Sequence, residues 1–411
     1  MKRIFLFLLM AMATGSVALA QYTRSLSEDI HTVRVLAGGD VLQPPVLPLG
    51  RGRFNVSFDR MGHDYTRYIY KVQLCNADWT VADEVFESDY MSGFNNQPIE
   101  DYETSFNTTQ LYTHYSLDFP NENCRLLLPG NYRVSIFEED EDEPVAEACF
   151  CLYSQQMNVI ASVSPNTDID VNKSHQQVSV ALNYGALKVV DPRRELHTVV
   201  LQNRRWDNAV TDVAPNIQKA SGAEWTHRRE LIFPAGNEYH KCEILDVHRA
   251  GMGVDRIGWY EPYFHATLFA SERARNYTDE GDTNGIFVVR HSGDEDNDTQ
   301  SEYLIVHFPF KADYIPGGQM YVCGLWDNGS PDPRCRMTYD EATGTYEAAV
   351  LLKQGYYSYQ YRFYPDEGGA GDTQLTDGNY YETENEYLVL VYHRAQGARY
   401  DALVAMTRVK S

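Results

Sequence analysis

Positive charge is scarce in this chain of 411 residues. Lysine and arginine together number 35, against 58 aspartate and glutamate residues, so the formal net charge is -23. Binding to nucleic acid or to anionic lipid surfaces depends on clustered basic side chains. The charge balance therefore argues against nucleic acid as a partner.

Long apolar stretches are missing after the first twenty residues. That N-terminal stretch has Lys2-Arg3, an apolar run from Ile4 to Ala13 and the small segment Ala18-Leu19-Ala20, the order typical of a secretory signal peptide. The run is shorter than the ~18 apolar residues that a membrane-spanning helix requires. We expect residues 1–20 to be removed on export. The mature chain would then begin at Gln21, which is not a lipid-modified cysteine.

The familiar catalytic and nucleotide-binding motifs are absent from the sequence. It contains no Gly-x-Ser-x-Gly, no Walker loop, no Gly-x-Gly-x-x-Gly and no His-Glu-x-x-His. Asp294, Asp296 and Asp298 begin like a calcium loop, but Thr299 stands where glycine is needed and Ile305 where glutamate is needed. We predict a protein that is not an enzyme and that has no metal and no cofactor.

Three histidines, His114, His307 and His393, fall within expected strands. Each lacks a second donor at a fixed offset in the sequence. The pattern therefore predicts hydrogen-bonded structural residues and not ligands.

Paired cysteine motifs are also missing. The seven cysteines include no two close pairs of the kind that hold zinc. An odd number leaves at least one thiol unpaired in a monomer. Cys323 and Cys335 flank one short loop and form the most plausible bridge, while the favoured alternative is that the cysteines are small buried apolar residues.

Tyrosine, by contrast, is abundant, with 30 residues. Aromatic side chains favour the pleated, half-buried surface of a strand. Apolar and polar residues alternate with a period of two, as in Phe54, Val56 and Phe58, and again in Tyr132, Val134 and Ile136. The acidic run Glu138 to Glu143 lies between two such segments and is expected at a hairpin tip. No long amphipathic helix is evident.

At about 150 residues per domain the length suggests roughly two to three domains. The first set of strands closes near Tyr153, and the polar, acidic segment Ser292 to Gln300 resembles a hinge. We therefore predict an all-β protein of three consecutive antiparallel β-sandwiches, immunoglobulin-like or early-set in type. Their expected bounds are residues 21–155, 156–292 and 300–411.

Several uncommon strings, in order along the mature chain, resemble the type IX secretion system plug proteins. They are Cys75-Asn76-Ala77-Asp78-Trp79, Ser105-Phe106-Asn107-Thr108, Tyr112-Thr113-His114-Tyr115, Gln202-Asn203-Arg204-Arg205-Trp206-Asp207-Asn208-Ala209, Ala235-Gly236-Asn237-Glu238, Leu351-Leu352-Lys353-Gln354-Gly355-Tyr356-Tyr357, Thr383-Glu384-Asn385 and Arg399-Tyr400-Asp401.

The resemblance implies a non-enzymatic plug on the periplasmic side of the outer membrane, which closes the outer-membrane translocon barrel when no cargo is passing. The residues that we expect to contact this partner are Asp78, Trp79, Arg205, Trp206 and Asp207, because aromatic and arginine side chains anchor interfaces. The alternative for these five is that they stabilise loops inside each sandwich.

The third unit also resembles sandwiches that bind glycogen or starch, so an exported carbohydrate-binding protein is the alternative function. The glycan ligands would then be Trp326 and Lys353. A shared fold does not by itself carry a ligand with it.

Overall fold

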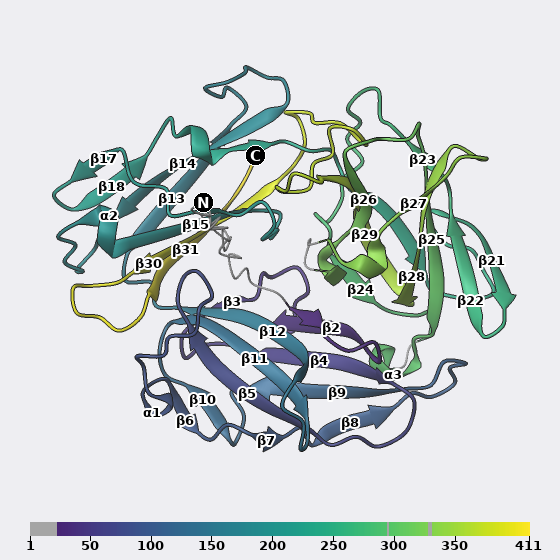
Figure 1. The fold of residues 1–411 in the computed structure, drawn as a ribbon. Helices are drawn as coiled ribbons and strands as arrows, with labels where there is room; N and C mark the ends of the chain where they lie inside the picture. Colours follow the sequence, from purple (N-terminus) through teal and green to yellow (C-terminus); the bar gives the residue numbers. More distant parts are fainter. Residues whose placement is uncertain (1–22, 294–295, 328–330) are drawn as a thin grey trace, which may run out of the picture.

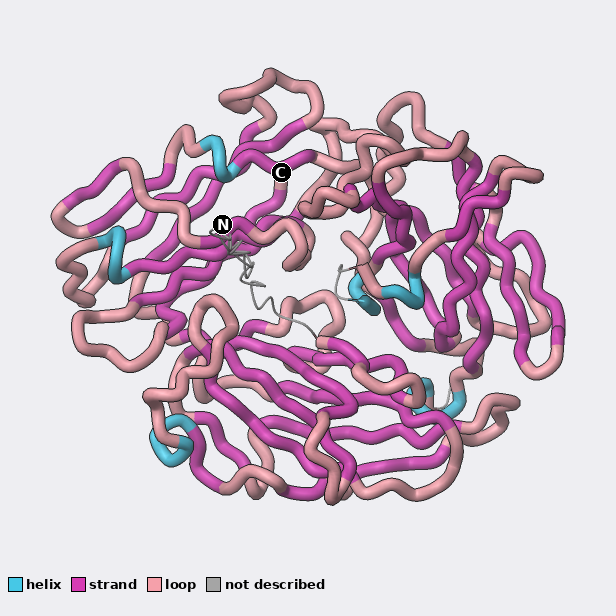
Figure 2. Tube along the Cα trace, viewed as in Figure 1, coloured by secondary structure: helices cyan, strands magenta, loops and turns pink. Residues whose placement is uncertain are grey.

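The computed structural model describes residues 23–293, 296–327 and 331–411. The expected signal peptide and Asp294 of the candidate calcium loop lie outside these ranges. Strands dominate the described residues, and their α-helical segments are only four residues long (Figure 2). The predicted all-β class is confirmed.

The first domain packs two sheets, β1-β12-β11-β5-β7 with β3 beside β12, and β2-β4-β9-β8, in which every pairing except the parallel one between β3 and β12 is antiparallel. Alternating residues meet across strands: Val134 lies opposite Val72 on one side and Ala148 on the other, and all three are buried. The elements are β1 Arg24–Ser25, β2 Ile30–Ala37, β3 Val46–Pro48, β4 Phe54–Met61, β5 Tyr68–Cys75, α1 Glu87–Tyr90, β6 Met91–Gly93, β7 Gln97–Pro98, β8 Asp101–Thr104, β9 Tyr112–Phe119, β10 Cys124–Leu126, β11 Gly130–Glu138 and β12 Pro144–Tyr153. The acidic run Glu138 to Glu143 forms the turn between β11 and β12, as expected.

The middle domain combines strands from two distant parts of the chain. Its sheets are β13-β14-β18-β17 with β19 beside β14, and β16-β15-β30-β31. The elements are β13 Asn158–Ser164, β14 His175–Asn183, α2 Pro192–Glu195, β15 Leu196–Gln202, β16 Val210–Thr211, β17 Ile217–Lys219, β18 Gly222–Trp225, the 3₁₀ turn η1 Arg229–Leu231, β19 Ile232–Pro234, β30 Glu386–His393 and β31 Ala402–Lys410.

The inserted domain occupies the chain between β19 and β30. Its sheets are β20-β29-β24 with β26 beside β29, and β21-β22-β25-β28-β27 with β23 beside β25. The elements are β20 His240–Ile244, β21 Val254–Tyr260, β22 Tyr263–Leu268, β23 Ser271–Glu272, β24 Phe287–Val289, α3 Asn297–Gln300, β25 Tyr303–Lys311, β26 Gly318–Cys323, the 3₁₀ turns η2 Leu325–Asp327 and η3 Pro333–Cys335, β27 Thr338–Asp340, β28 Thr345–Lys353 and β29 Gly355–Pro365.

This strand pairing differs from the expected division at residues 156–292 and 300–411. Strand β30 pairs with β15 over seven residues, so the C-terminal strands complete the middle domain. Strands β20 and β22, which we expected in the middle unit, pair with β29 and β25 of the inserted domain. Alternation along a strand reports which face is buried and not which distant strand lies beside it. The linear reading of the chain therefore missed the insertion.

The three domains lie around a common centre (Figure 1). The yellow strands β30 and β31 run among the teal strands of the middle domain, and the green inserted domain lies at the right of the view, beside both other domains. The chain passes directly from the first to the middle domain and crosses twice between the middle and inserted domains. The contact between the first and inserted domains is therefore made without a direct chain connection.

Candidate functional site

The seam between the first and inserted domains is built around a buried carboxylate, Asp59 on β4. It accepts hydrogen bonds from Lys353 Nζ on β28 (2.6 Å) and from the Tyr303 hydroxyl on β25 (2.6 Å). His114 Nδ1 on β9 lies 2.6 Å from its other oxygen. The side chains of Asp59 and Lys353 are 1% and 0% exposed. Both domains thus contribute groups to one ion pair that is closed to solvent.

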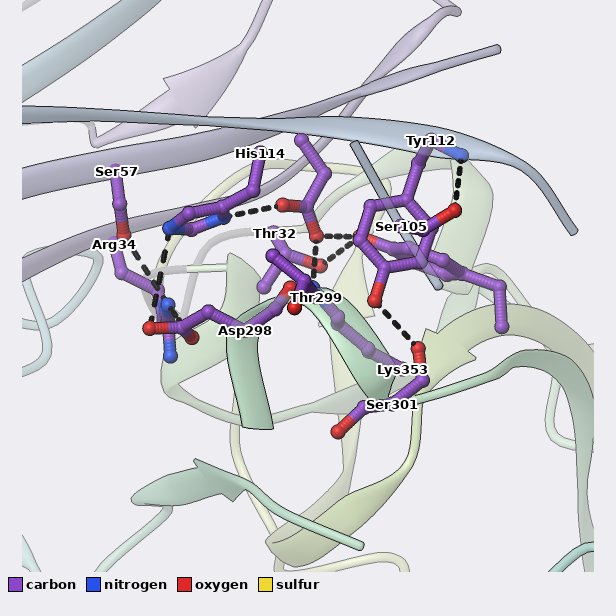
Figure 3. Close-up of polar contacts among 12 residues, drawn as sticks. Thr32, Arg34, Ser57, Ser105, Tyr112, His114, Asp298, Thr299, Ser301 and Lys353 are labelled. Carbon is purple, nitrogen blue, oxygen red and sulfur yellow. Dashed lines mark hydrogen bonds and ion pairs between the residues drawn. The ribbon is translucent and has the colours of Figure 1, made fainter. Parts of the chain in front are cut away.

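A second ion pair extends this cluster toward the surface (Figure 3). Arg34 on β2 donates to Asp298 in α3 at 2.5 Å, and the backbone carbonyl of Asp298 accepts from Lys353 Nζ at 2.5 Å. The Tyr112 hydroxyl on β9 donates to the carbonyl of Ser301 at 2.8 Å. We call Arg34, Asp59, His114, Asp298, Tyr303 and Lys353 the Asp59 cluster.

The electrostatics of the Asp59 cluster favour its charged form. Burial alone would raise the pKa of Asp59, but Lys353 and His114 hold it well below its usual range. Burial likewise opposes the charge on Asp298, and Arg34 lowers the pKa of that carboxyl. The two carboxylates, Asp59 and Asp298, therefore stay ionised at neutral pH. Because Asp59 and Lys353 are closed to solvent, the arrangement fits a structural ion pair better than an acid–base pair that must meet a substrate.

The seam between the first and middle domains is mostly apolar. Trp79 is 1% exposed and packs edge-on against Trp206, with ring centroids 5.6 Å apart. One buried cluster joins residues of both domains around this pair: Val46, Cys75, Ala77, Cys149 and Cys151 with Val199, Leu201, Leu388, Leu390, Tyr392 and Leu403. Burial of this apolar area holds these two domains together, and the Arg399–Asp89 ion pair at 2.6 Å adds a charged contact between them.

Left-handed backbone places both tryptophans. Trp79 itself has φ +66°, and the turn that leads to Trp206 contains Asn203 at φ +52° and Arg204 at φ +61°. Side chains other than glycine adopt such angles at a cost that the surrounding contacts must offset. Here Ala77 N donates to the Asp401 carboxylate of the middle domain at 3.0 Å, which fixes the turn before Trp79.

The seam between the middle and inserted domains centres on Asp207. Arg205 donates to both of its oxygens at 3.0 and 2.8 Å, and the Tyr364 hydroxyl on β29 donates at 3.0 Å. Arg205 also donates to the carbonyl of Gly371 at 2.7 Å. Although burial opposes its charge, Arg205 lowers the pKa of Asp207. This seam, like the Asp59 cluster, is a buried and charged contact.

The structure does not place the five predicted interface residues on one accessible surface. Trp79 and Arg205 are buried, and Trp206 and Asp207 are half-buried in the seams just described. Only Asp78 is exposed, and its carboxylate accepts from the backbone and hydroxyl of Thr80 within the same turn. Four of the five therefore hold the domains together, which is a larger role than loop stabilisation inside one sandwich.

Several of the family-like strings meet in the fold, although they are far apart in the sequence. His114 and Lys353 meet at Asp59 across a seam, whereas Asn203 bonds to Asn385 at 2.7 Å within the middle domain. Asn237 donates to the carbonyl of Asp377 at 2.9 Å. The sequence analysis treated each string separately, because these contacts form only once the chain is folded.

The bridge suggested between Cys323 and Cys335 is not formed, and both of these thiols are buried, as are the other five cysteines. An antiparallel bridge pairs Tyr321 with Arg336, so Val322 is the next position opposite Cys335. Successive side chains point to opposite faces of a strand. Cys335 accordingly packs with Val322 in the core of the inserted domain, and Cys323 points toward the Tyr364 hydroxyl at 4.0 Å.

The residues considered for glycan and calcium binding have other partners. Lys353 is 1% exposed and belongs to the Asp59 cluster, so it cannot reach a glucan, and Trp326 packs against Phe308 and Tyr357. Asp296 caps α3 by accepting from Asp298 N, and Asp298 binds Arg34. These residues are occupied by the fold itself.

Within residues 23–293, 296–327 and 331–411, no three His, Cys, Asp or Glu side chains are grouped as metal ligands. Over the same ranges, no helix has the length and apolar character to cross a membrane. What these parts of the chain do present is a three-domain β scaffold fixed by buried seams.

The comparisons with known proteins agree with a scaffold of this class. Residues 30–154 match the family model of the type 9 secretion system plug protein 1st domain. Residues 30–154 therefore form a first domain of the type IX secretion system plug protein family, which supports a role associated with type IX secretion.

Among solved structures, the chain is similar to a hypothetical protein from Parabacteroides merdae ATCC 43184. The two are 40% identical over 95% of this chain and 99% of the other, with a TM-score of 0.92. The C-terminal domain of the Streptococcus pyogenes antigen I/II-family protein AspA aligns at 6% identity and a TM-score of 0.18, too low to indicate a shared fold. No curated protein matches the sequence significantly.

Proposed function

We propose that this protein is a non-enzymatic periplasmic plug, which docks on the inner mouth of the type IX outer-membrane translocon barrel and closes it when no cargo is passing. The observation that carries the proposal is the match of residues 30–154 to the first domain of plug proteins. A barrel wide enough for folded cargo would let solutes cross the outer membrane whenever no cargo occupies it. Closing it requires a stable, complementary contact and no covalent chemistry.

The three seams support occlusion by a rigid body. Domains joined by small polar contacts move relative to one another by default. Here the Trp79 seam is apolar and buried, and the Asp59 and Asp207 carboxylates are paired within two other seams. A body held at all three contacts resists the deformation that would let cargo or solutes pass around it.

The surface that we propose for barrel docking lies at one end of the first domain, around Phe86 and Phe94. Their exposed fractions, 72% and 75%, are the largest among the big apolar side chains of the described residues. Asn95 donates to the Glu87 carboxylate at 2.8 Å, which holds the segments that carry the two rings next to each other. Exposed aromatic side chains are common anchors of protein interfaces.

Co-purification from the outer membrane tests this assignment. The tagged wild-type protein is expected to recover the translocon barrel, and the Phe86→Ser/Phe94→Ser variant to recover at least ten-fold less. Phe269→Ser is the matched control, since Phe269 is 61% exposed on the inserted domain. Equal recovery by the double variant would reject this docking surface. Failure of the wild type to recover any barrel would reject the plug function itself.

Deletion of the protein gives an independent test in cells. The open translocon is expected to admit antibiotics too large for ordinary porins, so the deletion strain should become sensitive to them. Complementation with the wild-type chain should restore resistance. A deletion strain that remains as resistant as its parent would contradict occlusion.

A further inference from the structure

Two histidines face each other on the outer surface of the inserted domain. His265 on β22 and His307 on β25 are diagonal neighbours on parallel strands, because Thr267 is the residue opposite His307. His265 Nδ1 and His307 Nε2 are 2.8 Å apart, and the ring planes are 26° apart. Both side chains are half-buried. Strands β22, β25 and β28 lie side by side at the outer edge of this domain (Figure 1).

A carboxylate on the next strand fixes the orientation of His307. Glu347 Oε1 on β28 lies 2.7 Å from His307 Nδ1. An ionised carboxylate can only accept, so Nδ1 of His307 carries the proton and Nε2 presents its lone pair toward His265. The second donor nitrogen that His307 lacks nearby in the sequence is that of His265, which lies forty-two residues earlier in the chain, on β22.

An aromatic ring covers one side of the histidine pair. Gly258 is the residue opposite His265 on β21, and the Tyr260 ring packs over this glycine and lies edge-on to His265 with centroids 5.3 Å apart. Neutral imidazole is the form that binds metal ions.

We propose that His265 and His307 form a binding site for a borderline divalent transition-metal ion such as Zn²⁺, with Glu347 orienting His307 and water completing the coordination. Imidazole nitrogens suit Zn²⁺, Cu²⁺ and Ni²⁺. A histidine whose other nitrogen donates to a carboxylate is the usual arrangement at zinc sites. The proposal does not depend on the plug function.

Metal entry requires only small changes. Two nitrogens that bind one tetrahedral zinc ion at 2.0–2.1 Å are about 3.3 Å apart. The rings must therefore swivel slightly from their present 2.8 Å separation. The proton on His265 Nδ1 moves to Nε2 of the same ring, so the two neutral imidazoles bind the ion without net proton release.

Calorimetric titration of the full mature protein with Zn²⁺ tests the site. We expect one saturable ion per chain in the wild type and no binding at this site in His265→Gln or His307→Gln. Glu347→Gln should weaken binding by about 10–100-fold, the usual effect of removing such a carboxylate. His227→Gln is the control, because His227 is exposed and pairs with Asp168 at 2.9 Å. It should bind like the wild type.

Absence of saturable binding at millimolar Zn²⁺, or unchanged binding in both His265→Gln and His307→Gln, would overturn the proposal. Circular dichroism of each variant checks that it is folded. Electron paramagnetic resonance of the wild type with one equivalent of Cu²⁺ gives a second readout, since two coordinated nitrogens are expected. A spectrum with no nitrogen ligand would also overturn it.

Discussion

Replacing Lys353 with methionine would leave the Asp59 carboxylate buried without its closest cation. Methionine keeps the length and apolar character of the lysine stem, so the change is mainly one of charge. The expected result is a large loss of stability at the seam between the first and inserted domains, because removing one partner of a buried ion pair leaves the other uncompensated.

The magnitude follows from the geometry. Opposite unit charges 2.6 Å apart, as Lys353 Nζ and Asp59 Oδ2 are, attract by about 6 kcal/mol at an effective dielectric constant of about 20. Methionine avoids the desolvation of the ammonium group, which offsets part of this attraction. A net loss of about 3–5 kcal/mol in the free energy of unfolding is therefore expected.

Urea denaturation at neutral pH measures this loss, and amide exchange at residues 301–303 reports whether the seam has opened. Arg53→Met is the matched control, since the Arg53–Asp118 pair joins neighbouring strands but its side chains are 66% and 38% exposed. It should cost only ~0–1 kcal/mol. A loss in Lys353→Met no larger than in this control would refute the reasoning.

The pH dependence of the loss gives a second check. In the wild type, partners hold the pKa of Asp59 below its usual range, so its stabilising contribution is complete above pH 4 and fades only in stronger acid. In Lys353→Met, burial would favour the protonated form of the Asp59 carboxyl. The difference between variant and wild type should therefore shrink as the pH falls toward 5.

Three further predictions concern other parts of the fold. Trp79→Ala should cost about 3–5 kcal/mol in urea denaturation, because Trp79 fills the seam with the middle domain and is 1% exposed; a loss below 1 kcal/mol would contradict this role. Burial, with Glu238 nearby, raises the pKa of Asp282 to about 7, so wild-type stability should fall between about pH 4 and pH 7. The stability gained by Asp282→Asn should thus be at least about 1.4 kcal/mol larger at pH 8 than at pH 5, and an equal difference at both values would exclude a raised pKa. Thiol titration without reductant should find seven free cysteines after unfolding and almost none before, whereas five after unfolding would indicate a bridge such as Cys323 with Cys335.

Local patterns predicted the strands well because alternation is a local property. Phe54, Val56 and Phe58, which alternate with polar neighbours in the sequence, are all buried within β4, and Tyr357, Tyr359 and Tyr361 are buried along β29. The partners of each strand were not predictable in the same way. Pairing of β15 with β30 joins segments separated by more than 180 residues. Nothing in the sequence of either segment identifies the other as its partner.

The difference between local patterns and distant contacts also explains why the candidate interface residues were assigned to the wrong kind of interface. Trp79 and Arg205 have the chemistry of interface anchors, and the structure does use them at interfaces, but between domains of one chain. Composition indicates that a side chain suits an interface and does not identify the surface on the other side. The Asp59 cluster carries no short-range signal, since Asp59 and Lys353 are 294 residues apart.

This placement also bears on how a plug could keep its shape. If the family-like strings formed the docking surface, the similarity of this chain to plug proteins would reflect binding to a shared partner. In this chain two of their contacts instead join domains: Asp401 fixes the turn before Trp79, and Lys353 binds Asp59. A third contact, between Asn385 and Asn203, lies within the middle domain. These strings therefore shape the body of the protein, and the proposed docking surface around Phe86 lies outside them.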